Sequence, residues 1–61
     1  MRVFRVEIVF KDGCGCFFYR SGERSEIIKD LSDDLGYFED PDTHIFHRKF
    51  DIRTFSLEEV S

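Results

Sequence analysis

The stretch "VFRVEIVFKDGCGCFFYRS", residues 3–21, decides the fold of this chain. Large apolar residues occupy every second position of its first half: Phe4, Val6, Ile8 and Phe10. A period of two is typical of a strand with one buried face. Asp12-Gly13 then predicts a tight turn, because both residues adopt positive φ easily. The aromatic residues that follow are therefore expected to form the second strand of a hairpin.

Two registers of this hairpin are compatible with the sequence. The loop is either the dipeptide Asp12-Gly13 or the four residues 12–15. These registers differ by two residues, and a shift of two leaves every side chain on the same face. Both predict that Phe17 and Tyr19 join the core. Both also place four residues on the opposite face: Cys14, Cys16, Phe18 and Arg20.

The apolar period changes after the second strand. Residues 23–35 carry apolar side chains at helical spacing, at Ile27, Ile28, Leu31 and Leu35, and this spacing predicts an amphipathic helix. Ser21 or Ser25 is expected to cap its first turn with a side-chain oxygen. Gly36 is expected to end it in the left-handed conformation.

A third strand is predicted over residues 44–55, "HIFHRKFDIRTF", which are rich in β-branched and aromatic residues. Its alternation loses phase near Thr54, which indicates a bulge or the start of a turn. Residues 56–59 fit a capping box and predict at most one helical turn. With a right-handed crossover, the β-β-α-β order predicts a single α+β domain over residues 1–61. Its three-stranded antiparallel sheet has the order 2-1-3, with one helix on one face and the other face bare.

The bare face and the aromatic content favour self-association. A chain of 61 residues buries only about 60% of the surface that its unfolded form exposes, yet this one contains eight phenylalanines. The predicted bare face has an apolar centre with charged residues around it, as interfaces do. We therefore expect a homodimer, formed through this face or through an exposed edge strand. The expected contact residues are Val3, Val9, Cys16 and Phe18.

The net charge of −4 is unevenly distributed. Residues 1–22 carry four basic and two acidic side chains, whereas residues 23–43 carry eight acidic and two basic ones. This acidic segment predicts a docking surface for a basic partner. Its expected members are Asp30, Asp33, Asp34, Glu39, Asp40 and Asp42.

Nucleic-acid binding is the second hypothesis. Basic side chains beside an aromatic ring on an open sheet are a known way to hold single strands. The bare face is expected to display such a set: Arg5, Arg20, Lys49 and Arg53.

The sequence predicts no metal, cofactor or catalytic site. Cys14 and Cys16 point to the same side of a strand, but structural zinc requires four ligands. His44 and His47, three apart on a strand, point to opposite faces and are not expected to meet the cysteines. No nucleophile–base pair or carboxylate pair marks an enzyme.

The remaining features bear on location and function class. The N-terminal residues lack the apolar run of a signal peptide, and no stretch approaches the roughly 20 apolar residues of a membrane span. We therefore expect a cytoplasmic protein with reduced thiols. The sequence as a whole favours a non-catalytic, regulatory interaction protein that binds or modulates a macromolecular partner.

Overall fold

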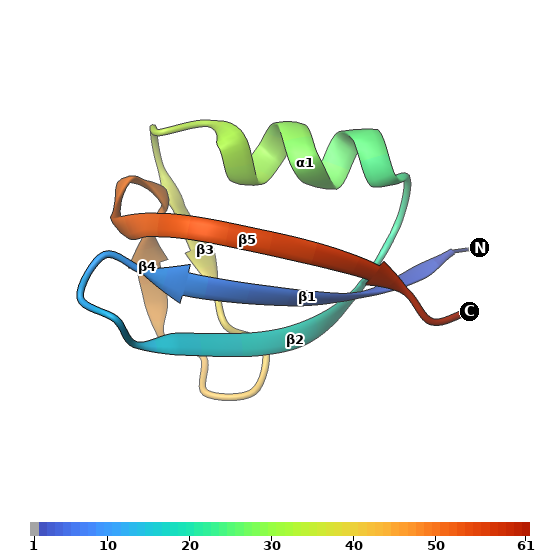
Figure 1. Cartoon of the computed structure of the whole chain (residues 1–61), viewed down its shortest axis with the longest axis horizontal. Coiled ribbons are helices and arrows are strands. Elements are labelled where there is room, and N and C mark those ends of the chain that lie inside the picture. The colour runs from blue at the N-terminus through green and yellow to red at the C-terminus, as the bar shows by residue number, and fades with distance from the viewer. Residues whose placement is uncertain (1) are drawn as a thin grey trace.

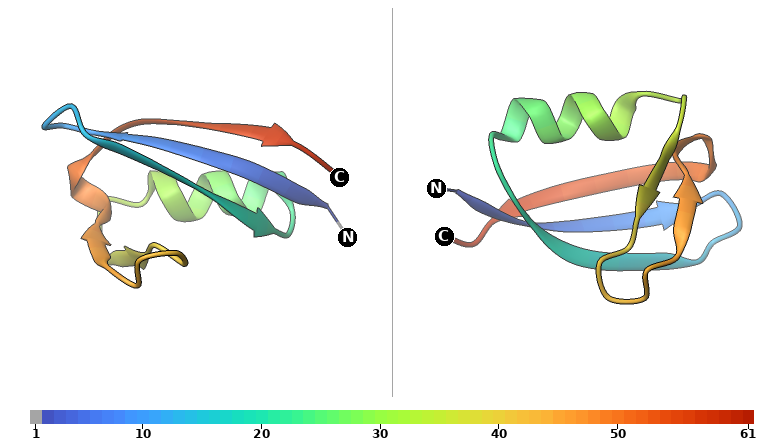
Figure 2. Two further views of the ribbon diagram at one scale, coloured as in Figure 1. Left: turned by 90° about the horizontal axis from the view of Figure 1, so that it is seen from below. Right: turned by 180° about the vertical axis from the view of Figure 1, so that it is seen from behind.

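The computed structural model describes residues 2–61. Its main sheet has three antiparallel strands in the order β2-β1-β5. The helix α1 and a short hairpin, β3–β4, both lie on one side of this sheet (Figures 1 and 2). The elements in chain order are β1 (Val3–Phe10), β2 (Gly15–Ser21), α1 (Arg24–Ser32), β3 (Tyr37–Glu39), β4 (Phe46–Arg48), a 3₁₀ turn (Lys49–Asp51) and β5 (Ile52–Glu59).

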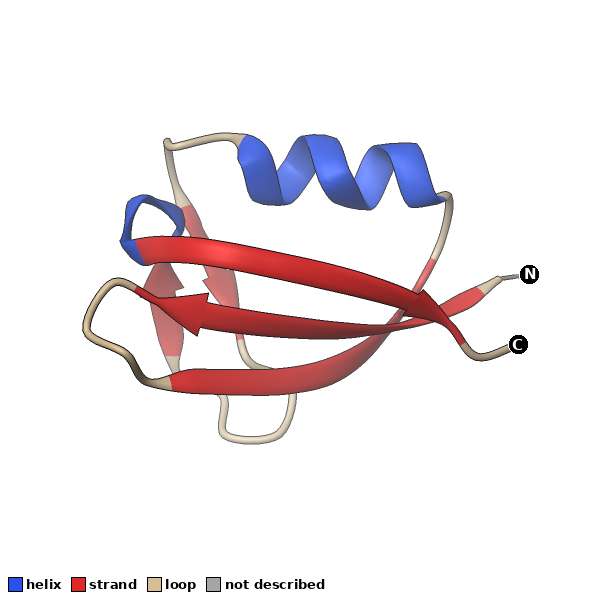
Figure 3. Cartoon of the chain, in the orientation of Figure 1, coloured by secondary structure: helices blue, strands red, loops and turns tan. Residues whose placement is uncertain are grey.

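The predicted α+β fold is confirmed, with β1 at the centre of the sheet and one helix packed against it (Figure 3). The alternation along β1 places its large apolar side chains on the face toward α1. There they pack with Ile27 and Leu31 of α1 and with Phe38 of β3. The buried residues of β1 are Phe4, Val6, Ile8 and Phe10.

The register of the first hairpin differs from both predicted registers. The loop has three residues, because the Phe10 N–H donates to the Cys14 carbonyl at 2.7 Å. The Gly13 N–H donates to the Phe10 carbonyl at 3.0 Å, and Gly13 has φ of 92°. A three-residue loop with its last residue in the left-handed region is a common hairpin connection. Val6 consequently lies opposite Phe18.

This odd loop length reverses the predicted faces of β2. Phe18 is buried in the core, whereas Phe17 and Tyr19 are 49% and 58% exposed. Cys16 lies opposite Ile8 and packs at the edge of the core. The prediction that Phe17 and Tyr19 join the core is therefore wrong, because both loops considered had an even number of residues.

The predicted third strand, residues 44–55, is divided between two sheets. Its first part forms β4, which pairs with β3, and the 3₁₀ turn then redirects the chain into β5. The predicted bulge is confirmed, since the β1–β5 register shifts where Thr54 and Ile52 pair with successive residues of β1. Residues 56–59 belong to β5 and form no helical turn. The strand that completes the main sheet thus lies nearer the end of the chain than predicted.

The helix is shorter than predicted. Its N-cap is Glu23, without a side-chain capping bond, so neither Ser21 nor Ser25 caps it. It ends four residues before Gly36, and Leu35 is 77% exposed beyond it. Gly36 does have positive φ, 88°, but it leads into β3. Within residues 2–61, no helix combines the length and the apolar character needed to cross a membrane.

Candidate interaction surface

Among residues 2–61, no helix, strand or turn covers one face of the main sheet. It is the face toward the viewer in Figure 1, and the left view of Figure 2 shows α1 and the β3–β4 hairpin on the opposite side. Alternation along the paired strands assigns the side chains of this face. They are Val3, Arg5, Glu7 and Val9 of β1, Phe17 and Tyr19 of β2, and Thr54, Ser56 and Glu58 of β5. We call this set the uncovered face.

Arg5 is the cation of the uncovered face, and two neighbours on that face hold it. Its guanidinium lies 4.5 Å from the centroid of the Phe17 ring, which is a cation–π contact. Its Nη1 donates to Glu7 Oε2 at 2.6 Å, and this hydrogen bond is the main cause that raises the pKa of Arg5 above its usual value. The side chains of Phe17 on β2 and of Arg5 and Glu7 on β1 therefore form one group, which combines an aromatic ring, a cation and a carboxylate.

The predicted set of self-association residues is divided between the two faces. Val3 and Val9 lie on the uncovered face. Cys16 and Phe18 lie on the packed side, where the Phe18 ring is 6.1 Å from the Phe38 ring. Burial of Phe18 corrects the prediction that it forms the centre of a contact surface. Phe17 and Tyr19 supply the exposed aromatic surface instead.

The predicted basic face is not assembled, because two of its four members bind Asp30 on α1. Arg20 Nη1 donates to Asp30 Oδ2 at 2.8 Å, and Lys49 Nζ donates to Asp30 Oδ1 at 2.7 Å. The bonds from Lys49 and then Arg20 lower the pKa of Asp30 below its usual range. The Lys49 side chain is only 10% exposed. Arg5 is on the uncovered face, and Arg53 is exposed on β5.

Most of the predicted acidic docking residues are engaged within the chain. Asp30 holds the two cations just described. Asp40 is buried, at 5% exposure, and its Oδ1 accepts from the Asp42 N–H at 2.9 Å. Two further members make contacts at exposed sites: Asp33 accepts from the Leu35 N–H at 3.0 Å, and Glu39 lies 3.3 Å from the ring of His44. Asp34 and Asp42 are exposed. These carboxylates therefore order turns and hold cations, which weakens the case for one continuous acidic surface.

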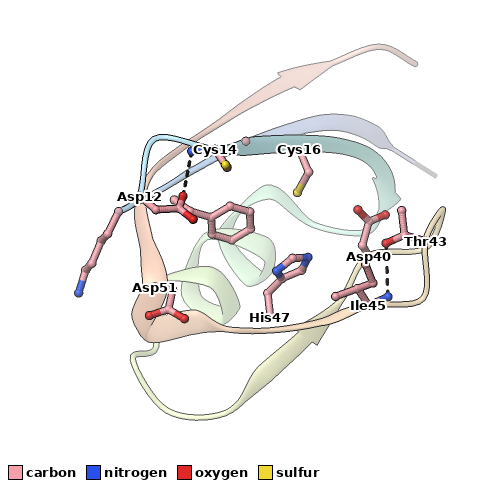
Figure 4. Close-up of a pocket in the computed structure, with 11 residues that line it drawn as sticks. Asp12, Cys14, Cys16, Asp40, Thr43, Ile45, His47 and Asp51 are labelled. Atoms are coloured by element: carbon pink, nitrogen blue, oxygen red, sulfur yellow. Dashed lines mark hydrogen bonds between the residues drawn. The ribbon is translucent and has the colours of Figure 1, made fainter.

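A groove of about 570 Å³ lies between the first hairpin and the β3–β4 hairpin. Figure 4 shows the Cys16 sulfur and the His47 ring directed into it, with the Asp40 carboxylate at its side. The His47 ring also stacks on Phe10 and Phe38, with centroids 4.7 and 5.3 Å away. His47 thus shares the groove with Cys14 and Cys16, because β4 belongs to a separate hairpin on the packed side of the main sheet, whereas His44 does not line the groove.

The residues of this groove are poorly suited to nucleophilic chemistry or metal binding. Burial, and secondarily the negative charge of Asp40, raise the pKa of the Cys16 thiol. A protonated thiol is a poor nucleophile and a poor metal ligand. Across residues 2–61, no three side chains of histidine, cysteine, aspartate or glutamate come together in a way that could hold a metal ion. The groove therefore ranks below the uncovered face as a candidate site.

Compared with known proteins, the chain matches no family model, no curated protein and no solved structure. The candidate site thus depends on the geometry of the chain alone.

Proposed function

We propose that this chain is a non-catalytic interaction protein that self-associates as a homodimer and uses its uncovered face to bind and modulate a protein partner. The observation that supports this proposal is the exposure of Phe17 and Tyr19, side by side with Arg5, on a sheet face that no other element covers. Free thiols at Cys14 and Cys16 are compatible with a reducing compartment, and we propose that the protein acts in the cytoplasm.

The composition of the uncovered face supports a protein partner. Tyrosine, phenylalanine and arginine are enriched in the centres of protein interfaces, whereas charged carboxylates are found at the rim. Phe17, Tyr19 and Arg5 lie together on β1 and β2, and Glu58 lies on β5, opposite Arg5. Aromatic and arginine side chains are also the residues that most often carry binding energy.

A photo-crosslinker in place of Phe17 tests this function. The experiment uses nuclease-treated lysate of the source cells, with the same crosslinker at Leu35 as the control, because Leu35 is exposed away from the main sheet. We expect a protein adduct from position 17 that the unlabelled chain competes away, and no such adduct from position 35. Equal labelling from both positions, or none from position 17, contradicts the proposal.

A second function, binding of single-stranded nucleic acid, is favoured by one observation. Phe17 and Tyr19 are half-exposed beside Arg5 on an open sheet, and exposed aromatic rings can stack on bases. The engagement of Arg20 and Lys49 by Asp30 weighs against it. Fluorescence anisotropy with a single-stranded oligonucleotide distinguishes the two functions. Nucleic-acid binding requires an affinity for the oligonucleotide that falls steeply between low and high salt. If the oligonucleotide does not bind at low salt, this second function is excluded and binding of a protein partner remains.

A further inference from the structure

The main sheet has two outer strands, β2 and β5, and in residues 2–61 each leaves one row of backbone groups without a neighbouring strand. Such rows are templates for pairing with another chain, and proteins commonly protect them with charged side chains. β5 carries three charged residues along its length: Arg53, Glu58 and Glu59. β2 contains no carboxylate, and Asp30 binds its one charged residue, Arg20. The β2 edge is therefore the less protected of the two.

The backbone groups that β2 offers at this edge follow from its pairing with β1. The carbonyl of Cys14 accepts from the Phe10 N–H, and the Gly22 N–H donates to the Arg2 carbonyl at 3.1 Å. In an antiparallel pair the hydrogen-bonded positions alternate along each strand. The even-numbered residues of β2 thus bond to β1. Its odd-numbered residues direct their N–H and C=O groups outward, and these include Phe17 and Tyr19.

We propose that two copies of this chain pair β2 to β2 in antiparallel orientation, with the twofold axis at Phe18, to form one continuous six-stranded sheet. This register pairs all seven residues of β2, and every odd position then exchanges hydrogen bonds with an odd position of the second copy. Phe17 lies opposite the partner's Tyr19, and aromatic pairs directly opposite each other stabilise a sheet. The inference rests on the self-association proposed above and specifies the surface that performs it.

Among residues 2–61, no element lies over the β2 edge on the side of the uncovered face (Figure 2). α1 and the turn between β3 and β4 lie behind the plane of the main sheet (Figure 2, left). The turn extends past β2 behind the sheet (Figure 1), so the turns of the two copies meet on the packed side of the shared sheet, near the twofold axis. A twofold axis perpendicular to the sheet keeps both uncovered faces on the same side. The dimer therefore doubles the uncovered face offered to a partner and places four aromatic rings at its centre.

The size of this contact predicts weak association. A fully exposed phenylalanine or tyrosine presents roughly 200 Å², so the half-exposed rings of Phe17 and Tyr19 in two copies offer roughly 400 Å² in total. Stable specific interfaces bury about 1,200 Å² or more. Backbone pairing adds to the aromatic area but leaves the contact at the small end. We therefore expect a monomer–dimer equilibrium at micromolar or higher concentrations.

Sedimentation equilibrium over a wide concentration range tests the edge. Phe17→Lys places a charge on the β2 edge, and Ser56→Lys places the same charge on the uncovered face at β5. We expect Phe17→Lys to weaken dimerisation at least tenfold and Ser56→Lys to leave it unchanged. Equal weakening by both variants would show face-to-face packing and overturn the edge model. An unchanged dimer in Phe17→Lys, or a wild-type chain that stays monomeric at millimolar concentration, also overturns it.

The register has its own test. Chains with Phe17→Cys and chains with Tyr19→Cys, both with Cys14→Ser and Cys16→Ser, are mixed and oxidised slowly. The proposed register predicts that disulfides join position 17 of one copy to position 19 of the other. A majority of 17–17 or 19–19 links refutes it. Neither result depends on the protein partner, so failure of the photo-crosslinking experiment and failure of the edge pairing are distinguishable.

Discussion

Both faces of β2 carry large aromatic residues, but one face is buried and the other is exposed. Phe18 is buried against Phe38, whereas its neighbours Phe17 and Tyr19 remain exposed. Neither composition nor β-propensity distinguishes three consecutive aromatic residues. The number of residues in the hairpin loop does, because it decides which parity points toward α1. Core and contact surface are thus assigned in this chain by one turn.

The largest expected effect comes from shortening the two phenylalanines in turn. Phe18→Ala removes a buried ring, and such changes cost about 3–5 kcal/mol, a large share of the total for so small a domain. Phe17→Ala removes a half-exposed ring and should cost less than about 1 kcal/mol. Urea unfolding followed by circular dichroism measures both. Equal destabilisation would contradict the register, and a greater loss in Phe17→Ala would support the even-loop alternative.

Two glycines of the first hairpin, Gly13 and Gly15, test the structure of the turn that decides which face of β2 is buried. A Cβ at Gly15 would lie 2.8 Å from the Ile8 carbonyl oxygen, which belongs to the backbone and has little freedom to move. Gly13 has open space around it and only its positive φ to preserve. We expect Gly15→Ala to cost about 2 kcal/mol through steric strain and Gly13→Ala about 1 kcal/mol. Thermal unfolding of the two variants measures the order, and the reverse order would contradict the close approach at Gly15.

The sequence predicted the packed face of β1, because four large apolar residues at every second position have one interpretation, a strand with one buried face. It also predicted an irregularity near Thr54, either a bulge or the start of a turn, and the structure has a bulge there. The faces of β2 were not predictable with the same certainty, since a loop of two, three or four residues is compatible with Asp12-Gly13. A glycine at the third loop position is a signal for the three-residue loop. This signal was the one available pointer to Phe17 and Tyr19 as surface residues.

The C-terminal half was less predictable for a different reason. Residues 44–55 alternate well enough for one long strand, but Phe46–Arg48 pairs with Tyr37–Glu39, a segment too short to show a period. The buried Asp40 supports the turn between them: its N–H donates to the Ile45 carbonyl, and its carbonyl accepts from the His44 N–H. Contacts of this kind join residues through the folded chain and leave no pattern in the sequence.

Asp30 allows the charge arrangement of the packed side to be tested at a moderate expected effect. Asp30→Asn removes the negative charge that pairs with Arg20 and the mostly buried Lys49 and leaves one acceptor oxygen for the two cations. We expect a loss of about 1–2 kcal/mol at pH 7. The bonds from Lys49 and Arg20 hold the folded pKa of Asp30 below the usual value for an aspartate. Its contribution to stability is therefore present above the unfolded pKa and is lost as the pH falls through the folded pKa.

Chemical unfolding of wild type and Asp30→Asn at pH 7, 5 and 2.5 measures this dependence. The stability difference should be the same at the two higher values and smaller at the lowest. Asp34→Asn is the matched control, because Asp34 is an exposed carboxylate just after α1. A pH-independent difference for Asp30→Asn would show that its role is steric.

The smallest expected effect concerns the two cysteines, which differ in reactivity without affecting the fold. Cys14 is exposed in the loop region, whereas burial and the charge of Asp40 raise the pKa of Cys16. Alkylation by iodoacetamide proceeds through the thiolate, so Cys14 should be labelled several-fold faster than Cys16 at pH 7.5. Asp40→Asn removes the charge and should lower the pKa of Cys16, which brings the two rates closer together. Peptide mass spectrometry of timed samples measures the ratio, with labelling in denaturant as the reference. Equal alkylation rates in the folded wild-type chain would mean that the Cys16 side chain does not lie in the groove wall. That result would contradict the three-residue loop, because this loop directs Cys16 toward His47.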